Sequence, residues 1–215
     1  MKIFTALTII LPLCFAPAIL HAKVFDLNNS RFSSSKTIFV SSQTDGLKAQ
    51  QTIQKMGEQA ITFLGDPSLS QDQKEKKFRQ LLNKNFDMNT IGRFALGKNW
   101  RLANQAQKAE YLKLFKNLVV KVYSSRFKDY NGEGFDVVSY RDTGKKDVTV
   151  TSYIIPNSGS KVQVDWRVRN KEGNYQVVDV SIEGVSMSLT QRSDFSSVIQ
   201  RGGGDIEVLL DHLRK

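Results

Sequence analysis

Cysteine and histidine are almost missing from this sequence of 215 residues, which has one cysteine, Cys14, and two histidines, His21 and His212. Zinc sites are built largely from thiolate and imidazole ligands, and cysteine proteases and Ser-His-Asp hydrolases depend on the same two residue types. Their scarcity argues against all of these enzyme classes. Because a disulfide needs two cysteines, none can form within this chain.

Long hydrophobic runs are missing after the first residues. Only residues 3–13 are almost continuously apolar; Lys2 precedes them, and small residues follow at Ala16 and Ala22. This order is typical of a secretory signal peptide, and the run is shorter than the ~20 residues of a membrane-spanning helix. Cleavage could follow Ala18 or Ala22, and we favour Ala22. We therefore expect residues 1–22 to be a signal peptide and the protein to be exported.

Acidic side chains are fewer than basic side chains. There are 21 Asp and Glu residues against 31 Lys and Arg residues, which gives a net charge of +10 and an isoelectric point of about 9.7. Such a charge attracts polyanions, namely nucleic acids, anionic lipid surfaces or acidic proteins. Because the protein is expected to be exported, we expect no nucleic-acid partner.

Hydrophobic periodicity divides the rest of the chain into an arm and one domain. Residues 23–45 are rich in polar residues without a sustained period, and we interpret them as a loose N-terminal arm. Residues 46–215 show no linker and are interpreted as a single domain. Ser70 and Asn104 each precede a glutamine by three residues, the pattern of a capping box. Helices are predicted at 47–64, 70–86, 87–96, 104–128 and 189–201, with a last one ending at Leu213.

Beyond Gly132 the hydrophobic period changes to that of a strand. Residues 161–169 alternate strictly between apolar and polar side chains, which is typical of an antiparallel sheet with one face in water. Four strands are predicted, around 135–138, 148–154, 161–169 and 175–182. Helices followed by strands and again by helices predict the α+β class, with a four-stranded antiparallel sheet packed against helices.

Three polar features were considered as catalytic sites, and none is favoured. Residues 92–99 come within one residue of a phosphate-binding P-loop, but Asn99 stands where the motif needs Ser or Thr, and the preceding residues are helical in pattern. Asp165 and Asp179 lie on neighbouring predicted strands, where a solvated cross-strand charge is the simpler interpretation. His212 lies close to the charged C-terminus. The sequence therefore predicts no catalytic and no metal-binding residues.

Apolar side chains are plentiful and form two stripes. One stripe follows the helix predicted at 104–128, and the other follows the strands from Val150 to Ile182. Such stripes can fill a core or surround an apolar ligand. The pattern by itself leaves both possibilities open.

Three stretches of the chain contain motifs that resemble those of a known protein family. Residues 86–101 begin F-D-M-N and end L-G-K-N-W-R, residues 107–123 space Gln, Tyr, Phe, Leu and Tyr along the long helix, and residues 180–195 contain V-S-I-E-G-V-S and then R-S-D-F. Together they resemble the MlaC family, the periplasmic phospholipid-binding components of the Mla lipid-transport system, also called toluene-tolerance auxiliary proteins. The resemblance covers about residues 85–215, in order.

The resemblance implies a carrier and not an enzyme, without a cofactor and with a bound phospholipid as cargo. It implies a curved antiparallel sheet with helices packed on it, related to the NTF2-like folds. Such carriers move phospholipid across the periplasm between an outer-membrane lipoprotein complex and an inner-membrane ABC transporter with an MCE-type subunit, which maintains outer-membrane lipid asymmetry. These are the expected partners and the expected location.

In such a carrier the acyl chains lie between helices and sheet, and the headgroup stays largely in water. The two apolar stripes would then line the lipid site. The residues expected to do so are Phe94, Trp100, Phe115, Val119, Tyr123, Val150, Val164, Trp166, Val180, Val185 and Phe195. Glu183 and Gly184 are expected to serve the structure, with the glycine permitting a turn where the last strand ends.

Three other functions stay open. A carrier or sensor of another apolar ligand, such as a hydrocarbon, sterol or quinone, could use the same scaffold. An NTF2-like enzyme would need polar residues inside the pocket, where the predicted inward positions are Val, Ile and Trp. A nucleic-acid-binding protein is opposed by the expected export, and steep salt dependence would be its mark.

Overall fold

The computed structural model describes residues 36–144 and 146–215, and it has the predicted α+β architecture. One antiparallel sheet has the strand order β1-β2-β3-β4-β5, so each strand pairs with its neighbour in the sequence. Four strands are long, as predicted, and a two-residue fifth strand was not predicted. The strands are β1 (Gly134–Thr143), β2 (Asp147–Ile155), β3 (Val162–Lys171), β4 (Asn174–Ile182) and β5 (Val185–Ser186).

Apart from the start of α1 and the short α4, which was not predicted, the helices begin and end close to the predicted positions. Ser70 and Asn104 both form the predicted capping boxes with the glutamine three residues later. Gly97, with φ of 59°, follows the helix Met88–Leu96 and ends it. The helices are α1 (Lys36–Leu64), α2 (Gln71–Asn85), α3 (Met88–Leu96), α4 (Asn99–Leu102), α5 (Gln105–Ser124), the 3-10 turn η2 (Phe127–Asp129), α6 (Met187–Arg201) and α7 (Ile206–Arg214).

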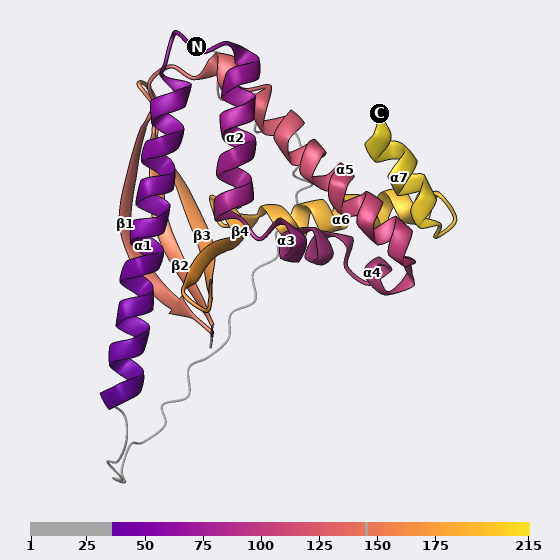
Figure 1. The fold of residues 1–215 in the computed structure, drawn as a ribbon, viewed down its shortest axis with the longest axis horizontal. Helices are drawn as coiled ribbons and strands as arrows, with labels where there is room; N and C mark the ends of the chain where they lie inside the picture. Colours follow the sequence, from indigo (N-terminus) through magenta and orange to yellow (C-terminus); the bar gives the residue numbers. More distant parts are fainter. Residues whose placement is uncertain (1–35, 145) are drawn as a thin grey trace, which may run out of the picture.

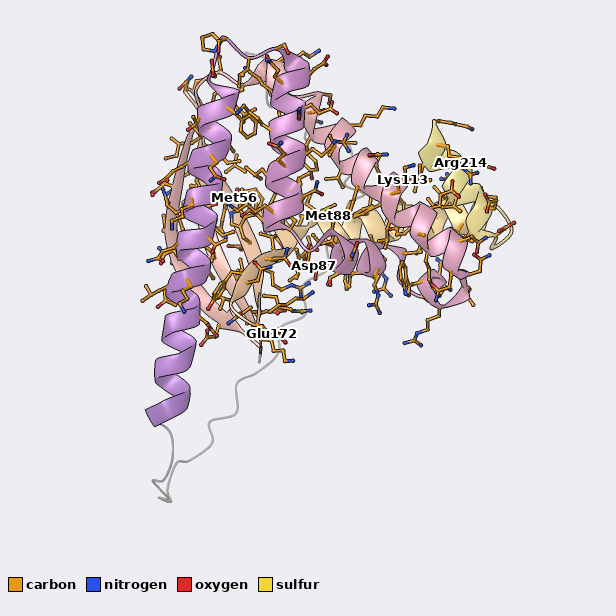
Figure 2. All side chains as sticks on the ribbon, viewed as in Figure 1. Met56, Asp87, Met88, Lys113, Glu172 and Arg214 are labelled. Carbon is orange, nitrogen blue, oxygen red and sulfur yellow. The ribbon has the colours of Figure 1, made fainter. Side chains whose placement is uncertain are left out.

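Two groups of helices surround two separate apolar clusters. Helices α1 and α2 lie over one face of the sheet, whereas α3 to α7 form a group beside it (Figure 1). The first cluster, here called the sheet cluster, joins α1 and α2 to the strands, with Ile53 and Val150 fully buried. The second, here called the helical cluster, has Tyr111 and Leu210 at its centre. Figure 2 labels one buried methionine of each, Met56 and Met88.

Helix α1 begins eleven residues before the predicted start at Leu47, so the interpretation of residues 23–45 as a loose arm is wrong from Lys36 onward. A local pattern missed this because residues 36–45 are mostly polar, and the helix is held by distant groups. The Asp45 carboxylate accepts hydrogen bonds from the Tyr175 hydroxyl and from Asn170 Nδ2, the latter at 3.0 Å. Residues 1–35, with the expected signal peptide and the rest of the arm, lie outside the described residues.

Two glycines let α1 approach the sheet closely. A Cβ atom on Gly46 would lie 2.0 Å from the Tyr140 ring, and one on Gly57 would lie 2.2 Å from the Phe135 ring. Both aromatic residues belong to β1. The two aromatic rings of β1 therefore pack directly against the backbone of α1 at these glycines, and α1 covers this face of the sheet.

The contact between Tyr175 and Asp45 predicts a pH dependence. Burial, together with the hydrogen bond to Asp45, raises the pKa of Tyr175 to about 12, from an ordinary value of about 10. Since the folded state favours the neutral phenol, its stabilising effect is present below pH ~10 and is lost as the pH rises towards 12. Urea unfolding across this range should show wild type losing its advantage over Tyr175→Phe. A constant difference between the two proteins would contradict the assignment.

Two β-bulges change which side chains face the helices. The register shifts between Val137 and Ser139 in β1, and β3 pairs Arg167 with Asp179 but Val168 with Val177, so Val138 and Val178 lie at bulges. The alternation of β4 therefore breaks, and Val177 joins Val180 in the sheet cluster. A strict two-residue period through Val180 would instead place Val178 on that face, and the bulge prevents this.

Among the residues that the structure describes, none of the helices is long and apolar enough to cross a membrane.

Candidate functional site

The sheet cluster has an aromatic centre at Trp166 of β3. Its ring lies 6.4 Å from the ring of Phe86 and 6.3 Å from the ring of Phe135, each in an edge-to-face arrangement. The indole N–H donates to Ser152 Oγ at 2.8 Å, and this hydroxyl donates in turn to the carbonyl of Val164 at 3.3 Å. Since the polar atoms at this centre are paired with each other, they leave an apolar surface towards the helices.

A groove of 510 Å³ opens onto the sheet cluster between α1 and α2. This α1–α2 groove has two buried residues in its lining, Phe63 and Leu81, and both belong to the sheet cluster. Its volume falls within the range of about 300–1,000 Å³ that is usual for ligand sites. The remaining lining is polar: Lys55, Glu58, Gln59, Thr62, Lys77, Gln80 and Lys84. The groove thus combines an apolar floor with a polar rim that carries three lysines and one glutamate.

The structure divides the residues expected to line a lipid site. Three lie in or against the sheet cluster, namely Val150, Trp166 and Val180. Four lie in or against the helical cluster, namely Trp100, Phe115, Val119 and Phe195. The others belong to neither cluster: Phe94 is half-buried, Val164 is buried, and Tyr123 and Val185 are exposed. The expected lining is therefore not brought together at one place.

Tyr123 of α5 lies at the edge of the sheet cluster. Its side chain is 40% exposed, and its ring lies 6.4 Å from that of Phe78, which packs against this cluster. Burial by the surrounding protein raises the pKa of its hydroxyl.

Sequence reasoning named none of the helical residues that face the sheet. These residues come from α1, α2 and η2, and they are Ala49, Ile53, Met56, Phe63, Phe78, Leu81 and Phe127. Several belong to the apolar periods that predict the helices at 47–64 and 70–86. A local pattern does not contain the surface against which such a helix packs, because that surface depends on how the helices dock.

The two clusters meet at Phe86 and Asp87. Phe86 packs against both clusters and forms a bridge with Val177, and the Asp87 amide donates to the Val177 carbonyl at 2.9 Å. Burial alone would raise the pKa of the Asp87 carboxyl, but hydrogen bonds from Lys171 and Thr90 outweigh it and lower the pKa. Asp87 therefore stays ionised and holds α3 against the sheet.

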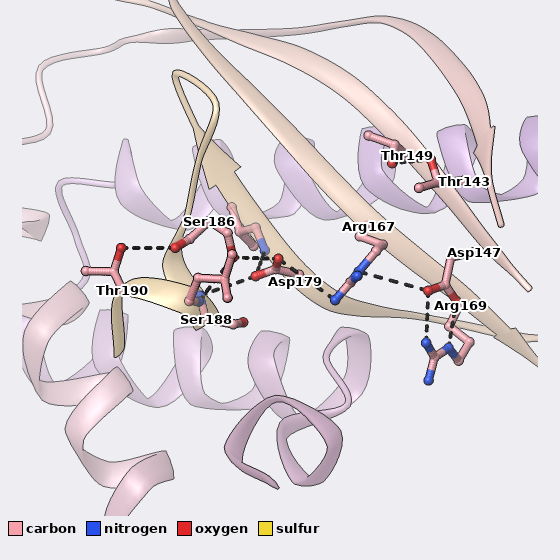
Figure 3. A network of polar contacts seen from close by, with 11 residues as sticks. Thr143, Asp147, Thr149, Arg167, Arg169, Asp179, Ser186, Ser188 and Thr190 are labelled. Carbon is pink, nitrogen blue, oxygen red and sulfur yellow. Dashed lines mark hydrogen bonds and ion pairs between the residues drawn. The ribbon is translucent and has the colours of Figure 1, made fainter. Parts of the chain in front are cut away.

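Asp165 and Asp179 connect elements of the structure through hydrogen bonds, and the expectation of a solvated charge is wrong for Asp179. Asp179 is buried, and its carboxylate accepts from Ser186 Oγ at 2.7 Å and from the Ser188 amide at 3.3 Å (Figure 3). Asp165 accepts from Thr151 Oγ1 at 2.6 Å, and His212 is exposed. Within residues 36–144 and 146–215, no group of three or more His, Cys, Asp or Glu side chains could hold a metal ion.

The E-G-V-S stretch turns the chain from the sheet into α6. Glu183 and Gly184 both have positive φ, 50° and 80°, and the glycine adopts this conformation without strain. Glu183 also pairs with Gln163, since its amide donates to the Gln163 carbonyl at 3.0 Å. Ser186 then caps α6 by accepting from the Leu189 amide at 3.2 Å. The expected structural role of Glu183 and Gly184 agrees with this geometry.

Comparison with known protein families gives a match over most of the chain. The family described as MlaC protein matches residues 54–215. The chain belongs to the MlaC family. The resemblance inferred from the motifs is thereby confirmed, and the match reaches about thirty residues further towards the N-terminus than those motifs did.

Relatives of this MlaC-family chain agree with the assignment. A toluene tolerance protein, ttg2D, from Pseudomonas putida is 24% identical over 111 residues, which are 52% of this chain and 52% of that protein, so the match spans about half of its length. Among solved structures, a phospholipid-binding protein from Ralstonia solanacearum in complex with a phospholipid has a TM-score of 0.67 and 26% identity. That similarity covers 77% of this chain and 94% of the other.

Proposed function

We propose that this protein is a periplasmic phospholipid-binding carrier. The observation that carries the proposal is the α1–α2 groove, whose apolar floor belongs to the sheet cluster. Membership of the MlaC family and the likeness to a structure that contains a phospholipid support it. The acyl chains would lie between the sheet and helices α1 and α2, around Trp166.

The energetics fit a carrier that exchanges lipid with membranes. About thirty acyl methylenes at ~0.8 kcal/mol each make a bare phospholipid in water unfavourable by roughly 25 kcal/mol. A membrane already buries these groups, so the protein has only to match that burial for transfer to be nearly neutral. The sheet cluster offers the required apolar surface, and to receive two chains α1 and α2 would have to move apart from the sheet.

Only some of the residues expected from the sequence are proposed here as direct lipid contacts. We assign the main contacts to Val150, Trp166 and Val180 in the sheet cluster, with Val164 beside them in the sheet and Tyr123 at the edge of the cluster. Trp100, Phe115, Val119 and Phe195 belong to the helical cluster and would contact lipid only indirectly. Phe94 and Val185 would lie at the periphery.

The transport role follows from family membership and is also a proposal. The protein would shuttle phospholipid between an outer-membrane lipoprotein complex and an inner-membrane ABC transporter with an MCE-type subunit, and so maintain outer-membrane lipid asymmetry. It would do so as a non-enzymatic protein without a cofactor, after cleavage of its leader behind Ala22.

Native mass spectrometry of the protein purified from periplasm without detergent tests this function. We expect a stoichiometric adduct with the mass of a phospholipid, which is lost on denaturation, and lipid extraction identifies the cargo. An adduct with the mass of a hydrocarbon, sterol or quinone would replace the proposed cargo with another apolar ligand. A bare mass without exchange from labelled liposomes would contradict the carrier function.

A further inference from the structure

Cationic side chains gather in the grooves on both sides of α2. The α1–α2 groove has Lys55, Lys77 and Lys84 in its lining, against a single acidic residue, Glu58. A second groove of 260 Å³ lies between α2 and α5, and its charged lining residues are all cationic: Arg79, Lys113 and Lys116. The side chains of the two grooves come from three helices, α1, α2 and α5, and Lys113 is labelled in Figure 2. The two grooves together hold six cations and one anion.

Helix α2 forms the ridge between the two grooves. Its residues Lys77 and Lys84 line one groove and Arg79 lines the other, so the solvent-facing side of the helix lies between them. Lys76 is exposed on that side. Glu75, the nearest acidic residue along the helix, is paired with Arg79 at 3.3 Å. The ridge and its two grooves are here called the α2 surface, on which Lys and Arg outnumber Asp and Glu, although the exposed Asp72 lies near the start of the helix.

We propose that the α2 surface docks the protein on an anionic lipid bilayer, with its lysines bound to headgroup phosphates. Protein–protein interfaces are enriched in arginine and depleted in lysine, whereas membrane surfaces attract flexible lysine charges without a fixed geometry. Five of the six groove cations are lysines, and the one arginine already donates to Asn117 Oδ1 at 2.9 Å. The composition of the surface therefore favours a bilayer over an acidic protein.

Both grooves also have apolar floors. Phe63 and Leu81 form one, and Leu82, Met88 and Val120 contribute to the other. Docking by the α2 surface turns the α1–α2 groove, and with it the sheet cluster, towards the membrane. This consequence rests on the proposed function, because it makes the groove the path by which acyl chains leave the bilayer. The docking itself depends only on the charges.

Vesicle sedimentation at low salt tests the docking. The probes are vesicles of phosphatidylcholine alone and of phosphatidylcholine mixed with phosphatidylglycerol. Wild type should bind the mixed vesicles, and the triple variant Lys55→Gln, Lys77→Gln, Lys84→Gln should bind them roughly a hundredfold more weakly, from the usual effect of each lysine at an anionic surface. The matched control is Lys98→Gln, Lys146→Gln, Arg201→Gln, which removes three exposed cations elsewhere.

The result that supports the proposal is a loss confined to the groove triple, in protein with wild-type thermal unfolding. Equal losses in both triples would show a net-charge effect and overturn it. Failure of wild type to bind mixed vesicles would also overturn it and would favour an acidic protein as the partner. Native mass spectrometry of the same samples keeps the two proposals apart, because an empty wild type that binds vesicles contradicts only the carrier function.

Discussion

Val180→Glu should yield a folded protein that has largely lost its lipid. Val180 lies directly opposite Trp166 on β4 and packs against the sheet cluster while remaining half-buried. A glutamate there can reach water in the empty protein but meets acyl chains in the loaded one. Keeping it neutral at pH 7 costs about 3.7 kcal/mol, which corresponds to a loss of lipid affinity of roughly five-hundredfold.

The matched control for this variant is Gln176→Glu on the same strand. Gln176 pairs with Arg169 in the sheet, so its new carboxylate would face a cation instead of the cluster. Native mass spectrometry should find lipid on the control and little on Val180→Glu, and lowering the pH towards 5 should restore part of the binding. A folded Val180→Glu protein with full lipid content would show that the acyl chains lie elsewhere.

Asp179→Ala should produce the largest loss of stability among the acidic residues on the polar face of the sheet. Its carboxylate accepts from Ser186 Oγ, from the Ser188 amide and from the Val180 amide, and it lies 3.9 Å from Arg167 (Figure 3). Removing it leaves these donors unsatisfied at the junction between sheet and α6. We expect the free energy of unfolding to fall by about 2–3 kcal/mol.

Asp165→Ala is the natural comparison, because Asp165 lies on the neighbouring strand. It accepts from Thr151 and Gln163 and is only half-buried, so its loss should cost about 1 kcal/mol or less. Urea unfolding of the two variants measures the difference. Similar losses of unfolding free energy in the two variants would mean that the bonds from Asp179 to Ser186 and Ser188 do not hold α6 against the sheet.

Several elements of this protein were predictable because the interactions that form them are local. The capping boxes at Ser70 and Asn104 each involve residues three apart, and both mark the true helix starts. The alternation over residues 161–169 predicted β3 in the same way, since the side chains of a strand point to opposite faces in turn. These contacts lie within one element, so the sequence alone contains them.

The candidate site was only partly predictable, because it is made of contacts between elements. Val150, Trp166 and Val180 lie opposite one another on neighbouring strands, whereas Phe115 and Phe195, expected in the same lining, pack around Tyr111 in the helical cluster. An apolar stripe shows that a face is buried and does not say against what. The bulges at Val138 and Val178 are a further example, because each depends on the partner strand.

The sequence by itself determined the α+β class, the order of the helices and long strands, and the resemblance to the MlaC family. Only the tertiary structure decided that α1 extends back to Lys36, which apolar cluster each stripe fills, and that lysines from α1, α2 and α5 meet around one ridge. The reason is that backbone propensities and caps act within a few residues. Docking depends on side chains that the chain brings together from up to 130 positions apart, as Asp45 and Tyr175 show.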